Sequence, residues 1–177
     1  MADDLYYGDA AVNKRLFAAT AIVTAPVIFS TAAGTGGPLL WNGSTDVLGR
    51  IISVSYALST ASAAAGALGW TGGAGQTAAP SSTTAIDSIQ NLYIGGPKPK
   101  ITPYRVGTVT AAGAAFAVLG QVGTTALTAL SDANNIFDLK RSIIIPPSGG
   151  WWSICGSATL TTGVFQITVV WEEIAIS

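Results

Sequence analysis

Two segments of the chain alternate apolar and polar residues with the two-residue period of a β-strand. They cover residues 48–59 and residues 164–176. The apolar positions are Ile52, Val54, Tyr56 and Leu58 in the first segment and Phe165, Ile167, Val169 and Trp171 in the second. Each segment therefore predicts a strand with one face in a core, and Trp171 is expected in that core.

Shorter strands are expected elsewhere along the chain, separated by Gly, Pro, Ser and Asp turn signals. The candidate strands are 16–33 (broken at Pro26), 90–95, 101–110, 114–119, 124–130, 136–145 and 151–160. The glycine-rich segments 34–38 and 71–85 are expected to be loops. Asp9 is a candidate N-cap for a short helix over residues 9–17.

Many short strands and no long helix predict an all-β fold, an antiparallel β-sandwich. Within this class a jelly-roll topology is expected. Residues 1–35 are expected to form an extended N-terminal arm or the first strands, and residues 36–177 the sandwich domain. Residues 1–15 are polar, and they form either a disordered tail or an arm that orders on a neighbouring subunit.

The composition bears on where this sandwich is placed, because charged residues make up only 10% of the 177 residues and apolar residues make up 49%. A typical soluble domain has roughly 25% charged residues, and the mean hydropathy here is positive, at +0.49. Such a chain is expected either to lie in a membrane or to have its surface covered in an assembly.

Four long stretches without charge suggest membrane spans, but each is interrupted by Gly, Pro or polar residues. These stretches are 16–45, 51–86, 106–131 and 142–171. The acidic N-terminus also lacks the basic region of a secretory signal. We therefore expect no membrane association and favour the assembly.

Candidate chemistry is sparse. The net charge is −1, and the lysines and arginines are scattered singly or in short pairs, so no nucleic-acid partner is expected. Histidine is absent and the single cysteine, Cys155, lies in an apolar stretch. This removes histidine-based catalysis and most metal sites. Glu172 and Glu173 are adjacent, so a strand sends them to opposite faces, and they are expected to mark its solvent end. No enzyme activity and no cofactor are expected.

The chain resembles virion structural proteins of tailed bacteriophages, in particular small capsid decoration (cement) proteins and related jelly-roll accessory subunits. The resemblance spans roughly residues 37–174 and does not include the N-terminal 35 residues. It is carried by Gly-Pro-Leu-Leu-Trp-Asn at 37–42, Ile-Ile-Ser-Val-Ser-Tyr-Ala-Leu-Ser-Thr at 51–60, Tyr-Arg-Val-Gly-Thr-Val-Thr at 104–110, Ile-Pro-Pro-Ser-Gly-Gly at 145–150 and Val-Val-Trp-Glu-Glu-Ile at 169–174.

The resemblance implies a homotrimer on the capsid surface of the virion, bound to the major capsid protein and stabilising the assembled head. It transfers no individual site residue. Three alternatives stay open: a tail, fibre or head–tail adaptor component, a carbohydrate-binding β-sandwich, and an enzyme that uses aspartates. The aspartates considered for that enzyme are Asp46, Asp87, Asp132 and Asp138.

Tryptophans are the candidate subunit-interface residues, because buried aromatic anchors dominate binding energy at protein interfaces. The candidates are Trp41, Trp70, Trp151 and Trp152. Trp151 and Trp152 are adjacent, so they point to opposite faces of a strand and do not share one core. One of them is therefore either an interface anchor or packed against another layer of the same subunit.

Overall fold

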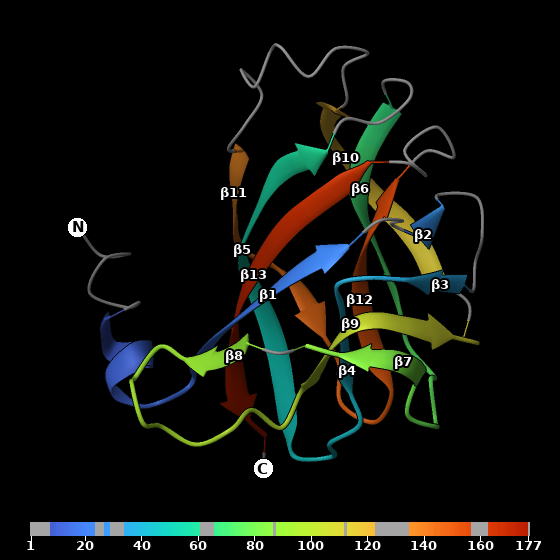
Figure 1. Ribbon diagram of the computed structural model, residues 1–177. Helices are drawn as coiled ribbons and strands as arrows, with labels where there is room; N and C mark the ends of the chain where they lie inside the picture. The colour runs from blue at the N-terminus through green and yellow to red at the C-terminus, as the bar shows by residue number, and fades with distance from the viewer. Residues whose placement is uncertain are drawn as a thin grey trace.

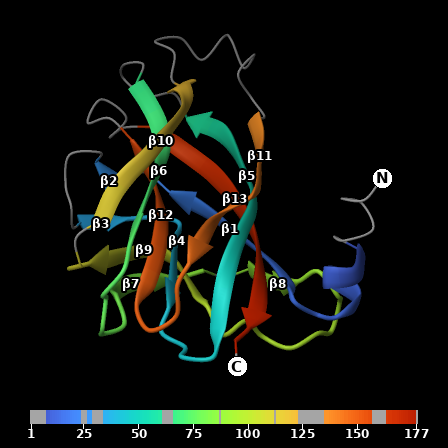
Figure 2. The same cartoon turned by 180° about the vertical axis from the view of Figure 1, so that it is seen from behind.

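Two antiparallel sheets pack face to face in a computed structural model of the chain (Figure 1). The structure describes residues 8–23, 27–28, 34–60, 66–86, 88–111, 113–122, 135–156 and 163–176. The strand expected at 124–130 lies outside these residues, as do Pro26 and most of the turn expected at 132–135. Figure 2 shows the same sandwich from behind.

The five-stranded sheet has the order β11–β5–β13–β1–β8. Its strands are β1 (Leu16–Val23), β5 (Val47–Thr60), β8 (Ser88–Asn91), β11 (Asn135–Ile145) and β13 (Val164–Ala175). The long strand β13 is at its centre, paired along its length with β5 on one side and β1 on the other.

The eight-stranded sheet has the order β10–β6–β12–β4–β9–β3, with β2 beside β12 and β7 beside β9. Its strands are β2 (Val27–Ile28), β3 (Gly34–Gly36), β4 (Leu39–Asn42), β6 (Gly66–Gly73), β7 (Ser81–Ala85), β9 (Thr102–Val109), β10 (Gly113–Val122) and β12 (Gly150–Gly156). Every pairing is antiparallel except that of β2 with β12. The predicted all-β antiparallel sandwich is confirmed.

The two alternating segments form β5 and β13, as predicted, and the candidate strands at 101–110, 136–145 and 151–160 form β9, β11 and β12. Two loop predictions are wrong in part, because β3 lies within 34–38, and 71–85 includes the end of β6 and all of β7. These strands have few apolar side chains. They form because β9 pairs its backbone with both β3 and β7, so a tertiary partner overrides weak strand propensity.

Residues 16–23 belong to the sandwich. A short helix at residues 8–12 precedes β1, which lies between β13 and β8. The expected boundary between residues 35 and 36 falls inside β3. Residues 16–23 form the strand β1 of the five-stranded sheet.

The core between the sheets is apolar and contains all four inward positions predicted on β13. Phe165, Ile167, Val169 and Trp171 are fully buried. A β-bulge in β5 opposite Val170 and Trp171 adds one residue to the strand, and Ile51 and Ile52 are both buried beside it. The simple alternation predicted for this strand therefore breaks at Ile51.

Strand β12 separates two apolar clusters. Trp152 faces the main core, whereas Trp151 faces the other side of the sheet and packs with Leu39 and Val109 in a second cluster, which we call the outer cluster. The side chains of adjacent strand residues point to opposite faces, so one dipeptide contributes a tryptophan to each cluster. All seven residues of β12 are buried.

Truncating Trp152 should destabilise the fold more than any surface change. We expect Trp152→Ala to lower the free energy of unfolding by about 3–5 kcal/mol, because a large cavity remains in a packed core. Ile136→Ala, at a side chain that is 74% exposed, is the control and should change it by less than about 0.5 kcal/mol. Urea unfolding followed by tryptophan fluorescence measures both. Equal effects would contradict the assignment of Trp152 to the core.

Candidate functional site

The four candidate interface tryptophans fall into two pairs. Trp151 and Trp152 are 3% and 1% exposed, so within this conformation they have almost no surface to offer a partner. Trp151 packs with Leu39 and Val109 on the outer face of its own sheet. Trp41 and Trp70 are only partly buried, Trp41 against the outer cluster and Trp70 against the main core. They stay candidates for a subunit contact.

Gln76 holds the loop over the outer cluster. Its side-chain oxygen accepts hydrogen bonds from the backbone N–H groups of Thr110 and Ala111 at 2.9 and 3.0 Å, and its Nε2 donates to the Ala78 carbonyl. Its own carbonyl accepts a hydrogen bond from Trp41 Nε1 at 3.1 Å. The side chain is almost completely buried. One amide thus joins the loop to β9, and its backbone carbonyl fixes the orientation of Trp41.

Removing this amide should loosen the outer cluster. We expect Gln76→Ala to cost about 1–3 kcal/mol, because the N–H groups of Thr110 and Ala111 would lose their acceptor. Thr77→Ala, at the exposed neighbouring residue, is the matched control. Chemical denaturation measures the stability, and hydrogen exchange at Thr110 and Ala111 locates the change. Unchanged protection of both amides would refute this role for Gln76.

The two adjacent glutamates at the end of β13 are buried, so the prediction that they mark a solvent end is wrong. Glu172 is fully buried and forms an ion pair with Arg15 at 3.5 Å. Glu173 accepts backbone hydrogen bonds from Lys100 at 3.0 Å and Ile101 at 2.8 Å. They do point to opposite sides, as predicted, and each ties β13 to a segment distant in the sequence. Sequence patterns did not reveal these partners.

Burial raises the pKa of the Glu173 carboxyl above its ordinary 4.5, although the N–H groups of Ile101 and Lys100 oppose the shift. A raised folded-state pKa means that the protonated carboxyl stabilises the fold at low pH. That stability is lost as pH rises through the raised pKa.

Replacing Glu173 by glutamine should remove this pH dependence. We expect the wild-type protein to lose unfolding free energy, relative to Glu173→Gln, as pH rises from 4.5 through the raised pKa. Asp46→Asn is the control. Its pairing with Lys100 lowers the pKa of the Asp46 carboxyl below 3.8, so its contribution changes only at lower pH. Denaturation at a series of pH values measures the slopes; parallel slopes for wild type and Glu173→Gln would contradict the inferred shift.

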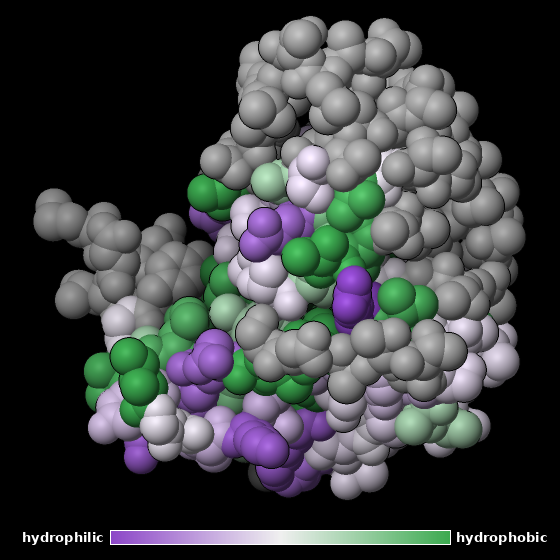
Figure 3. All heavy atoms as spheres, viewed as in Figure 1, coloured by the Kyte–Doolittle hydropathy of each residue, from purple (hydrophilic) through white to green (hydrophobic). Residues whose placement is uncertain are grey.

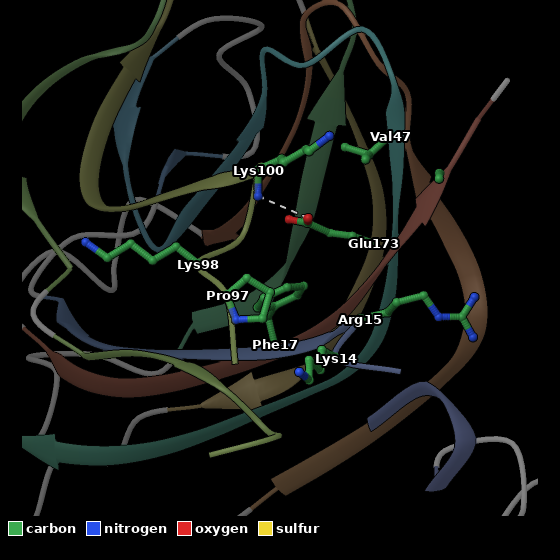
Figure 4. Close-up of a pocket in the computed structure, with 9 residues that line it drawn as sticks. Lys14, Arg15, Phe17, Val47, Pro97, Lys98, Lys100 and Glu173 are labelled. Atoms are coloured by element: carbon green, nitrogen blue, oxygen red, sulfur yellow. Dashed lines mark hydrogen bonds between the residues drawn. The ribbon is translucent and has the colours of Figure 1, made fainter. Parts of the chain in front are cut away.

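A shallow pocket of about 260 Å³ adjoins Glu173 (Figure 4). It lies among the starts of β1 and β5, the end of β13, and the segment 97–100. Four cationic side chains border it, namely Lys14, Arg15, Lys98 and Lys100. In the sequence these cations form two short groups that lie far apart. The pairing of β1 with β13 brings the first group to this site. The hydrogen bonds that Lys100 N and Ile101 N donate to Glu173 bring the second.

Exposed apolar side chains gather around the edges of the five-stranded sheet. Figure 3 shows apolar atoms beside the N-terminal helix and the segment that follows β8. The exposed apolar residues in this region are Val12, Ile89, Leu92, Tyr93 and Ile94. Ile94 is 95% exposed, and at the other edge of the sheet Ile136 on β11 is 74% exposed. Lys14 lies 4.9 Å from the centre of the Tyr93 ring, which links the helix to this surface.

Within the described residues, the remaining candidate side chains lie apart from one another. Asp46 is exposed and pairs with Lys100, whereas Asp87 and Asp132 lie outside the described residues. Asp138 is exposed on β11. Cys155 is a free, buried thiol whose pKa is raised to about 12 by burial, which makes it a poor nucleophile. Among the described residues no three His, Cys, Asp or Glu side chains form a cluster that could hold a metal ion.

Within the described part of the chain, no helix has the length and apolar character needed to cross a membrane. No protein-family model matches the chain. No curated protein matches it either. The function is therefore argued from the sandwich and its surface.

Proposed function

We propose that the chain is a structural subunit of a virion, a capsid decoration or cement protein that binds and stabilises the assembled head of a phage. The observation that carries the proposal is the combination of very few charged residues with exposed isoleucines at both edges of one sheet. Exposed apolar surface of this kind marks protein contacts.

We further propose that the sandwich is a jelly roll. Eight strands support this when β2, β3, β7, β8 and β9 are left aside; in chain order they are β1, β4, β5, β6, β10, β11, β12 and β13. One sheet has the order β1–β13–β5–β11, which is the first, eighth, third and sixth of the eight. The other sheet has the order β4–β12–β6–β10, which is the second, seventh, fourth and fifth. This is the strand order of a jelly roll, an architecture found in viral capsid proteins and also in lectins. Of the strands left aside, β8 extends the five-stranded sheet beyond β1, β9 with β3 and β7 extends the other sheet beyond β4, and β2 lies beside β12.

A cement subunit needs no catalytic group. It binds the assembled shell and not the free shell protein, so binding stabilises the shell by mass action. Apolar side chains at the rim of a rigid sandwich suit this role, because little conformational entropy is lost when they are covered. As a homotrimer, the subunit would present three copies of the same contact surface to the shell.

Particle binding tests the proposal. Virions carrying the chain should contain many copies spread over the head, seen by electron microscopy and counted by quantitative mass spectrometry. A few copies restricted to the tail would instead favour the tail, fibre or adaptor alternative. Glycan binding by the purified protein, without particle binding, would favour the carbohydrate-binding alternative.

A matched pair of variants tests the surface. Ile94→Asp should weaken binding to particles by about tenfold or more, since burying one such side chain contributes about 1.5–3 kcal/mol and 1.4 kcal/mol is tenfold. Thr77→Asp, at an exposed residue of the loop over the outer cluster, should bind like wild type. Sedimentation of particles with added protein measures both affinities. Equal binding by the two variants would exclude Ile94 from the contact.

A further inference from the structure

The pocket beside Glu173 combines an apolar floor with a cationic rim. Phe17, Val47, Pro97 and Ala175 contribute apolar lining. The rim contains four of the eight lysines and arginines in the chain. In Figure 4 the side chains of Arg15 and Lys98 extend outward on opposite sides of the pocket. A ligand for this site therefore needs both an apolar group and negative charge.

Two of the four cationic side chains at the pocket are paired with carboxylates. Arg15 is paired with Glu172, and Lys100 with Asp46. The Glu173 carboxylate accepts hydrogen bonds from two backbone N–H groups, so it has partners without a cation. Lys14 and Lys98 have no carboxylate partner within the part of the chain that the structure describes. These two lysines are available to an acidic ligand.

The size of the pocket favours side chains over a small-molecule ligand. Its volume is about 260 Å³, below the range of roughly 300–1,000 Å³ typical of small-molecule sites. It is also open to solvent along one side. One large apolar side chain, held on a peptide that carries acidic neighbours, fits these limits.

The chain itself contains such a peptide. Residues 3–7 read Asp-Asp-Leu-Tyr-Tyr, which places two carboxylates directly beside a leucine and two aromatic rings. Asp3 and Asp4 are the only adjacent aspartates in the sequence. They match the two unpaired lysines in number and opposite charge.

We infer that this pocket receives the acidic, aromatic N-terminal segment, residues 1–7, of a second copy of the chain. The helix at residues 8–12 favours a second copy over the same subunit. This helix ends beside the pocket, where Arg15 N donates to the Ala10 carbonyl and Lys14 has a φ of 61°. Because the five helical residues precede that end, a segment before them would have to turn back along the helix to enter the pocket of its own subunit, and the pocket of a neighbouring subunit imposes no such turn. The inference deepens the proposed assembly role and rests on it.

Charge exchange in the full-length chain tests the inference. Asp3→Lys/Asp4→Lys and, separately, Lys14→Asp/Lys98→Asp should each weaken self-association by about tenfold, because like charges then face each other. An equimolar mixture of the two variants should restore association to within about threefold of wild type, since each carries the surface that the other needs. Mass photometry over a range of concentrations measures the association, with Lys140→Asp on β11 as the control variant.

A second measurement does not depend on the variants folding. A synthetic peptide with the sequence of residues 1–9, added in excess, should dissociate wild-type assemblies, and the same peptide with both Asp3 and Asp4 replaced by Asn should not. Self-association that resists both the peptide and the charge reversals would overturn the inference while leaving the proposed function standing. A wild-type chain that stays monomeric and binds no particle would overturn both.

Discussion

The pairing of β13 along both of its edges is the constraint on which the rest of the structure depends. This strand places four fully buried apolar side chains in the core, and it joins β1 on one of its edges to β5 on the other. At its end, Glu172 and Glu173 hold Arg15 and the segment 100–101. The pocket with its cationic rim is a direct product of this pairing.

A sandwich with so few charged residues uses several of them within its own structure. Buried carboxylates are costly unless they are hydrogen-bonded or paired. Glu172 meets a guanidinium that offsets its cost, whereas the two N–H groups that Glu173 meets offset its cost only in part, since burial still raises the pKa of its carboxyl. Exposed isoleucines lie at both edges of the five-stranded sheet, Ile89 on β8 and Ile136 on β11, although β11 also carries Lys140 and Arg141.

The fold class could be predicted from the sequence because alternation on β5 and β13 is a local property of the chain. The strands β3 and β7 could not, since their residues have little strand propensity and depend on β9. The burial of Glu172 and Glu173 was also out of reach, because no pattern within the strand shows that Arg15 and the backbone at Lys100 lie opposite. The adjacent pair Trp151–Trp152 correctly predicted that β12 places apolar side chains on both of its faces. The packing of Trp151 with Leu39 and Val109 depends on strand pairing, so the sequence did not reveal it.

The outer cluster has a consequence for the local opening of the molecule. It lies on the outer face of β4, β9 and β12, and the adjoining loop is held by hydrogen bonds of Gln76. Local units of this kind open at a lower free energy than the whole fold does. A conformation of this kind would present the indole rings of Trp41 and Trp151 to a docking neighbour at a small fraction of the cost of global unfolding.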